Sequence, residues 1–200
     1  MRALAPLVTE EDLFISSLGG LRNDWWNHRP GGVDNTFFVS GMGAVLPTAL
    51  GLAVALPHRR VVALETDGSV LMNTSALCTL GNELPANLTV VVFDNAVYES
   101  IGGLATHTSR RTDLARMAEG AGCVNCLTIH DVEAFTPEAE KMLNDGELGF
   151  LVARIEPGIH RWPVDQQKLT DGVEDKYRFV RHIEQLEGIR TLHPAPGPFA

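Results

Sequence analysis

Cysteine and positive charge are both scarce in this sequence. Of its 200 residues, 3 are cysteines and 16 are lysines or arginines, against 25 aspartates and glutamates. So few cysteines do not make the disulfide framework of a small secreted protein, and we expect reduced thiols. The formal net charge of −9 opposes broad electrostatic attraction to nucleic acid or anionic lipid. We therefore expect no nucleic-acid partner.

Long uninterrupted apolar runs are missing as well. The longest uncharged apolar stretch, residues 39–58, contains three glycines and two prolines, which makes it a poor membrane span. The first residues do not resemble a signal peptide, because Glu10, Glu11 and Asp12 fall where an apolar core should lie. These features predict a cytoplasmic protein without a membrane partner.

The length suits one compact α/β domain, and a second full domain does not fit. We place this domain at residues 1–157. Residues 158–200 form a C-terminal extension with a polar stretch, a charged helix at 176–187 and a proline-rich end. The extension either lies at a subunit interface, wrapped around a partner chain, or frays at its end.

Short apolar runs alternate with longer stretches of helical period along the first domain. This alternation is typical of a mostly parallel sheet covered by helices. The predicted strands are residues 13–18, 36–39, 61–65, 89–93, 126–129 and 151–155. The predicted helices are residues 44–55, 71–84, 113–121 and 137–144, the last with Thr136 ahead of it. We expect a three-layer α/β/α fold with about six strands.

The loops that follow strands are the first place to look for chemistry, because ligands of such sheets bind at the carboxyl ends of the strands. Asp67, Gly68 and Ser69 put a carboxylate, a flexible backbone and a hydroxyl at the start of a helix, which suits a phosphate bound through Mg²⁺. Asp-Gly is also among the commonest turn dipeptides, so this loop alone does not establish a ligand.

A second loop strengthens the interpretation. The next buried-looking strand, residues 89–93, ends at Asp94 and Asn95. The 28 positions from Asp67 to Asn95 accommodate one helix and one strand, a right-handed crossover that sets the two loops side by side. Asp67 and Asn95 are therefore predicted to meet at one metal ion.

These residues resemble the thiamine-diphosphate enzymes, whose diphosphate-binding domain carries Gly-Asp-Gly and, some two dozen residues later, Asn-Asn. Here Thr66 replaces the first glycine and Asp94 the first asparagine. The resemblance implies a thiamine-diphosphate-binding fold. It also implies Mg²⁺ ligands from Asp67, Asn95 and the backbone carbonyl of Val97, and diphosphate contacts from Gly68 and Ser69.

The resemblance covers roughly residues 13–157 and is closest to the sulfopyruvate and phosphonopyruvate decarboxylases. It implies that Gly41, Met42 and Gly43 form the loop beneath the aminopyrimidine, where Met42 props the cofactor in its bent conformation. The loop at residues 16–20 is similar to another diphosphate contact of the family, and we assign Ser16 and Gly19 to it.

The segment after the metal motif is also similar to these decarboxylases. Tyr98 is predicted to shape the cofactor pocket. His107 is the catalytic candidate, since it could hold the acidic group of the substrate, with Arg110 and Arg111 as weaker candidates. An ordinary solvated loop is the alternative for all three. Leu104 departs from the polar residue expected at its position.

The implied function is a thiamine-diphosphate- and Mg²⁺-binding subunit of a 2-oxo-acid decarboxylase. The family's activating glutamate comes from a pyrimidine-binding domain, which does not fit in this chain, so a partner chain is expected to supply it. The alternatives are a subunit of a carboligase similar to acetolactate synthase and a non-catalytic structural subunit.

A ferredoxin-linked role is the lesser alternative. Cys123 and Cys126 have the spacing of metal or redox cysteines, and β subunits of 2-oxo-acid:ferredoxin oxidoreductases bind the same cofactor. A cluster requires four thiolates, whereas only Cys78 remains, so buried inert thiols are favoured.

Overall fold

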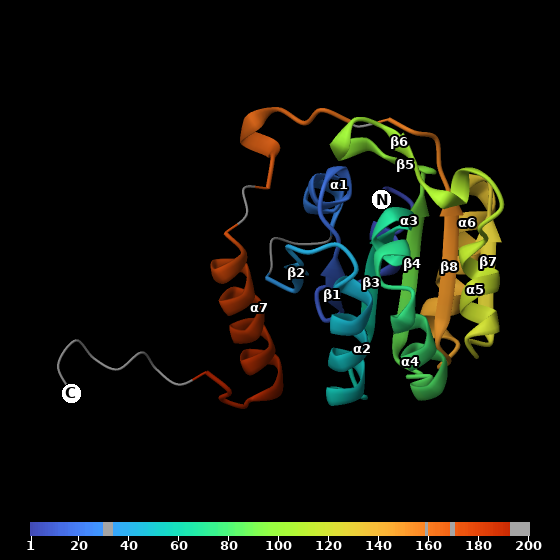
Figure 1. The fold of residues 1–200 in the computed structure, drawn as a ribbon. Coiled ribbons are helices and arrows are strands. Elements are labelled where there is room, and N and C mark those ends of the chain that lie inside the picture. Colours follow the sequence, from blue (N-terminus) through green and yellow to red (C-terminus); the bar gives the residue numbers. More distant parts are fainter. Residues whose placement is uncertain (30–33, 159, 169–170, 193–200) are drawn as a thin grey trace.

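The computed structural model describes residues 1–29, 34–158, 160–168 and 171–192. Its centre is a six-stranded sheet in the order β2-β1-β3-β4-β8-β7, in which every neighbouring pair is parallel (Figure 1). The strands are β1 (Leu13–Ser16), β2 (Thr36–Phe38), β3 (Val61–Thr66), β4 (Leu88–Asp94), β7 (Asn125–Ile129) and β8 (Gly149–Arg154). Each overlaps a predicted strand, and the predicted fold class is confirmed.

Helices cover both faces of the sheet and complete the three layers. One apolar cluster lies between the sheet and α2 (Val45–Ala55), α4 (Ser75–Glu83), α5 (Leu114–Gly120) and α7 (Gly172–Glu187). The opposite cluster involves α1 (Gly20–His28) and α6 (Val132–Asn144). Alternate residues of a strand enter opposite clusters, as the two-residue period of a strand requires: Ala63 packs in the first and Leu64 in the second.

Shorter elements complete the part of the chain that the structure describes. They are α3 (Asp67–Met72), the antiparallel hairpin of β5 (Val97–Tyr98) and β6 (Leu104–Ala105), and four 3₁₀ turns, η1 (Ala5–Leu7), η2 (Glu99–Ile101), η3 (His107–Ser109) and η4 (Val164–Gln166). No helix among the described residues is long and apolar enough to cross a bilayer.

The helix predicted at 71–84 is wrong in its bounds. Two helices, α3 and α4, occupy this region, because Asn73 leaves the helical conformation at φ −143° and ψ 61°. The earlier start of α3 places Asp67 and Gly68 in its first turn, directly after β3. These residues were expected in the loop just ahead of a helix starting at residue 71, whereas they form the first turn of the helix itself.

The start predicted for the helix at 137–144 is also wrong. The side chain of Asp131 accepts a hydrogen bond from the backbone amide of Ala134 at 2.7 Å and caps α6 five residues earlier than Thr136 would. Pro137 lies inside the helix. Helix α1 was not predicted at all, since it carries only two buried residues, Leu21 and Trp25.

The segment predicted as a C-terminal extension contributes a helix to the first apolar cluster. Phe179 of α7 is 6% exposed and stacks on Phe37 of β2, with ring centroids 6.0 Å apart. The connection that leads to α7 lies along α1, where Trp162 Nε1 donates to Asp24 Oδ1 at 2.7 Å. The proline-rich end lies outside the described residues.

The sheet order locates the expected ligand site. The chain runs from β1 outward to β2 and then returns to place β3 on the other side of β1. The reversal makes the carboxyl ends of β1 and β3 the topological switch point, where open α/β sheets bind ligands.

Candidate functional site

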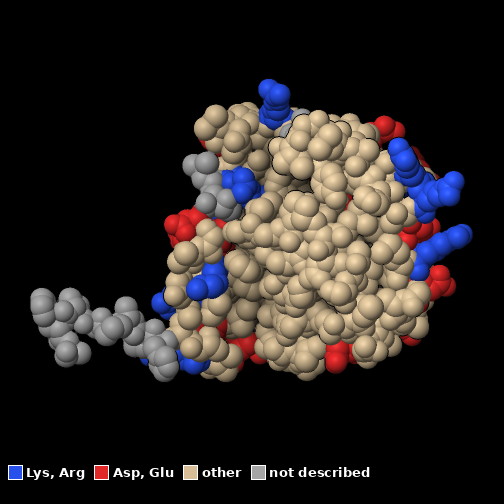
Figure 2. Space-filling model, in the orientation of Figure 1, with Lys and Arg blue, Asp and Glu red and all other residues tan. Residues whose placement is uncertain are grey.

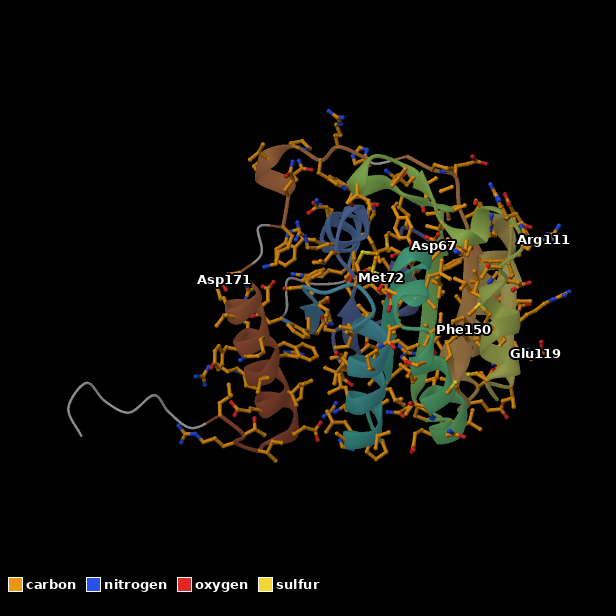
Figure 3. The ribbon with its side chains drawn as sticks, in the orientation of Figure 1. Asp67, Met72, Arg111, Glu119, Phe150 and Asp171 are labelled. Carbon is orange, nitrogen blue, oxygen red and sulfur yellow. The ribbon has the colours of Figure 1, made fainter. Side chains whose placement is uncertain are left out.

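A cavity of about 370 Å³ lies at this edge of the sheet. Loops that follow β1, β2, β3 and β4 all contribute to its wall. Figure 3 shows Asp67 at this end of the sheet, with Phe150 of β8 nearer its middle. The sequence-predicted residues that line the cavity are Gly19, Met42, Asp67, Gly68, Asn95, Val97 and Tyr98.

Asp67 is the first residue of α3 and is only 1% exposed. Its Oδ2 accepts hydrogen bonds from Thr106 Oγ1 at 2.5 Å and Thr108 Oγ1 at 3.1 Å. Burial raises the pKa of Asp67 above its ordinary value, and the nearby Asp94 raises it further, whereas the threonine hydroxyls oppose the rise. A divalent cation at this carboxylate would offset the desolvation that raises the pKa.

Thr66 shows why the first glycine of the family motif is dispensable here. Its φ of −116° and ψ of 155° are ordinary extended values, and its hydroxyl caps α3 by accepting from the amide of Ser69 at 3.4 Å. Gly68 is different, because the ring of Tyr98 packs against it where a side chain would begin. A Cβ atom on Gly68 would clash with the Tyr98 ring, so the packing of Tyr98 requires glycine at this position.

Asp94 stands where the family motif has its first asparagine. Its negative charge is balanced by a side chain of the neighbouring strand β8. Its carboxylate is buried, and its Oδ2 lies 2.6 Å from Arg154 Nη1. Its Oδ1 accepts from Thr108 Oγ1 at 2.7 Å. Arg154 is the register partner of Asp94 on β8, so the sheet holds this ion pair in place. Thr108 joins Asp94 to Asp67 through one hydroxyl.

The turn after Asp94 presents the other two predicted metal ligands. Asn95 Oδ1 accepts from the amide of Val97 at 3.1 Å, and Ala96 between them has a φ of +63°. This arrangement is an Asx turn, which such polar side chains stabilise locally. Asn95 and Val97 line the same cavity as Asp67. A side-chain amide, a backbone carbonyl and a carboxylate are oxygen groups of the kind that Mg²⁺ takes as ligands.

The glycine loop holds Met42 against the same cavity, although 41% of Met42 remains exposed. The amide of Gly43 donates to Ser69 Oγ at 3.0 Å, and the carbonyl of Gly43 accepts from Asn73 Nδ2 at 2.9 Å. Ser69 is fully buried and lies outside the cavity lining, so the structure places it beneath the loop. Gly41 also lies outside the lining and is exposed.

The loop after β1 reaches the cavity through different residues from those predicted. Ser16 is fully buried, and its hydroxyl donates to the backbone carbonyl of Ser17 at 3.2 Å. Ser17 lines the cavity together with Gly19, whose φ is +78°. Ser17 is the first residue after β1 and so stands at the carboxyl end of the strand, where ligands of such sheets bind.

Glu65 is a buried carboxylate in β3, two residues before Asp67. Its side chain accepts from the backbone amides of Leu46 and Thr66, both at 3.3 Å. Burial raises the pKa of Glu65 to about 7, against the opposing effect of hydrogen bonds from Ser69, Thr66 and Leu46. No role was predicted for Glu65 from the sequence.

His107 lies outside the cavity. It is exposed and borders a separate depression with Arg110 and Arg111. Its neighbours Thr106 and Thr108 point inward to Asp67 instead. These two threonines were not predicted as site residues, and the alternation of hydroxyl side chains in Thr106-His107-Thr108 was the available signal. A catalytic role for His107 stays a prediction.

Cys123 is buried and Cys126 is half-buried, and both are free thiols. Within the described ranges, no group of three or more histidine, cysteine, aspartate or glutamate side chains is placed to hold a metal. The residues around Asp67 fit a different kind of ion, because Mg²⁺ usually takes one or two carboxylates and obtains its other ligands from waters and phosphates.

Comparisons with known proteins identify the family of this chain. Residues 18–153 match the family described as thiamine pyrophosphate enzyme, C-terminal TPP binding domain. Sulfopyruvate decarboxylase subunit beta of Methanocaldococcus jannaschii is 30% identical over 92% of this chain and 95% of its own length. Phosphonopyruvate decarboxylase of Streptomyces viridochromogenes is 41% identical over 43% of this chain and 21% of its own length.

Solved structures share the fold at lower identity. Benzoylformate decarboxylase from Polynucleobacter necessarius superimposes with a TM-score of 0.65 at 18% identity, over 80% of this chain and 33% of the solved chain. 4-Hydroxybenzoylformate decarboxylase from Rhodococcus jostii gives a TM-score of 0.66 at 18% identity, over 80% of this chain and 32% of the solved chain. The present chain thus spans about a third of these solved chains. It belongs to the family of thiamine pyrophosphate enzymes and corresponds to their C-terminal TPP-binding domain.

Proposed function

We propose that this chain is the thiamine-diphosphate- and Mg²⁺-binding subunit of a 2-oxo-acid decarboxylase of the sulfopyruvate or phosphonopyruvate type. The observation that carries the proposal is the single cavity that Asp67, Gly68, Asn95 and Met42 share at the switch point of the sheet. The decarboxylase relatives support the reaction class.

The roles of the residues follow from their places. Asp67, Asn95 and the carbonyl of Val97 would hold the metal ion, and the amides at the start of α3 would face the diphosphate. Met42 would support the ring system from the other side. Thiamine diphosphate, once bound, supplies the electron sink that lets carbon dioxide leave a 2-oxo acid. Thr106 and Thr108 would fix the orientation of the Asp67 carboxylate, since both hydroxyls donate to its Oδ2.

A partner chain would complete the active site. A relative of nearly equal length carries the name subunit beta, whereas sulfopyruvate decarboxylase of Methanosarcina acetivorans uses 32% of its length for the matching part. The remainder of such an enzyme would then come from a second chain here, including the activating glutamate. The face around α2 supports this arrangement, since α2 has no charged residue and Figure 2 shows charged side chains mainly at the edges of that face.

Substrate recognition would depend on both chains. His107, Arg110 and Arg111 stand outside the cavity, and they would meet the acidic group of the substrate only where the partner closes the site. The cytoplasmic location predicted from the sequence stays a prediction.

Calorimetric titration tests the proposal. Thiamine diphosphate is titrated into the chain with and without Mg²⁺, first alone and then mixed with the protein encoded beside it. Metal-dependent binding that tightens with the partner, followed by release of carbon dioxide from sulfopyruvate or phosphonopyruvate, is the expected result. Turnover that requires a second carbonyl substrate would indicate a carboligase, and a lack of binding under every condition would leave a structural subunit.

A further inference from the structure

Glu65 connects the segment that follows the glycine loop with the start of α3 through hydrogen bonds of its buried carboxylate. It is the penultimate residue of β3, its side chain is 0% exposed, and it is not part of the cavity wall. One carboxylate oxygen, Oε1, accepts from the amide of Leu46 in the first turn of α2, and the other accepts from the amide of Thr66. The side chain of Ser69 in α3 also donates to this carboxylate.

Ser69 extends the connection to the glycine loop. Its Oγ accepts from the amide of Gly43 at 3.0 Å, and its side chain also hydrogen-bonds to the Glu65 carboxylate. Asn73 holds the carbonyl of Gly43 at 2.9 Å. The residue just before Gly43 is Met42, which faces the cavity. A continuous set of hydrogen bonds therefore leads from the end of β3 to the loop that carries Met42.

A carboxylate suits this position because three donors converge there. A buried carboxylate is costly unless donors surround it, and buried donors are costly when left without an acceptor. An apolar side chain of similar size would fill the volume but leave the amides of Leu46 and Thr66 and the hydroxyl of Ser69 unsatisfied.

We propose that Glu65 is a positioning residue that fixes the glycine loop carrying Met42 relative to the first turn of α3, which carries Asp67. It would so set the relative places of the two ends of the bound cofactor. The inference rests on the proposed function, because it assigns Met42 to the ring system and Asp67 to the metal. Glu65 acts through Ser69 and Gly43 and does not itself contact the cofactor.

Amide hydrogen exchange on the cofactor-free chain tests the connection without any activity. The variants are Glu65→Leu, which removes the acceptor, Glu65→Gln, which keeps its shape and part of its hydrogen bonding, and Ser69→Ala. The matched control is Thr89→Val on β4, which removes a buried hydrogen bond from Thr89 Oγ1 to the Met142 carbonyl of α6. We expect exchange across residues 40–46 to rise about tenfold in Glu65→Leu, less in Glu65→Gln, and not in the control.

Kinetics of the chain assembled with its partner provide the second measurement. We expect kcat to fall by about tenfold or more in Glu65→Leu while the Kd for Mg²⁺ in the presence of thiamine diphosphate changes less than about threefold, because the metal ligands are untouched. Partial recovery in Glu65→Gln, and a Glu65→Gln/Ser69→Ala double variant no worse than the poorer single variant, would identify one shared connection.

Two results would overturn the inference. Unchanged exchange at residues 40–46 in Glu65→Leu would show that Glu65 does not hold the loop. A loss of kcat in Glu65→Leu no larger than that in Thr89→Val would show only general destabilisation. Failure of the wild-type assembly to bind thiamine diphosphate would instead overturn the proposed function, and the exchange experiment would still decide whether Glu65 holds the loop.

Discussion

Gly43 approaches Asn73 so closely that a Cβ atom on Gly43 would lie 2.9 Å from the Cβ of Asn73. Gly43 also has a φ of +77°, in the left-handed region that side chains disfavour. A Cβ atom on Gly41, two residues earlier, would have no atom within 4 Å. One glycine of this loop is thus required by packing, and the other is not.

Replacing Gly43 with alanine is therefore expected to destabilise the chain by about 1–2 kcal/mol, through the positive φ and the contact with Asn73. Gly41→Ala is the matched control, with an expected change within about 0.5 kcal/mol. Urea unfolding of both variants measures the difference. Equal stability of the two would mean that the loop shifts freely away from Asn73.

Asp67→Asn is expected to lower Mg²⁺-dependent affinity for thiamine diphosphate by about a hundredfold or more, because it removes a charged metal ligand from a buried site. The amide retains the shape of the carboxylate and an oxygen to accept from Thr106. Calorimetric titration measures the affinity, and thermal unfolding checks that the fold survives. Undiminished metal dependence would refute the assignment of Asp67 as a ligand.

Arg154→Met is expected to destabilise the chain by about 2 kcal/mol, because Asp94 is left buried without its cation and Arg154 is itself partly exposed. Adding Asp94→Asn should recover most of this loss, since a neutral amide needs no ion pair. A double-mutant cycle by urea unfolding gives the coupling, and strict additivity would mean that the pair contributes nothing. Arg116→Met serves as a control, since that side chain is 84% exposed.

Phe179→Ala is expected to cost about 3 kcal/mol, because it removes a buried ring from between α7 and β2. Val173→Ala on the same helix should change stability by less than about 0.5 kcal/mol, since Val173 is 62% exposed. Denaturant unfolding compares the two. A small effect at Phe179 would show that α7 docks weakly on the sheet.

The burial of His182 leads us to expect a loss of stability at acid pH. Burial lowers the pKa of His182 below its ordinary value, with Arg59 acting in the same direction and Asp34 opposing. The folded state therefore takes up a proton at His182 less readily than the unfolded state. The stability that neutral His182 contributes to the folded state is present above about pH 6.5 and is lost as the pH falls below that value. His182→Gln should flatten this part of the pH profile of unfolding free energy, and an unchanged slope would contradict the prediction.

The sequence by itself determined the layers of the fold and the edge of the sheet at which ligands are expected. The apolar runs at 61–65 and 89–93 became β3 and β4, because a parallel strand buried on both faces requires such a run. Parallel strands send their carboxyl ends to one edge, so the neighbouring positions of Asp67 and Asn95 followed from their places after these strands.

Only the tertiary structure decided which side chains support those residues. Thr106 reaches Asp67 from 39 positions away, and Arg154 reaches Asp94 from 60 positions away. The pairing of Arg154 with Asp94 depends on β8 entering the sheet between β4 and β7, out of chain order. Local patterns record burial and backbone preference, whereas contacts between distant segments are chosen by the packing of the whole sheet, which no single stretch of the sequence specifies.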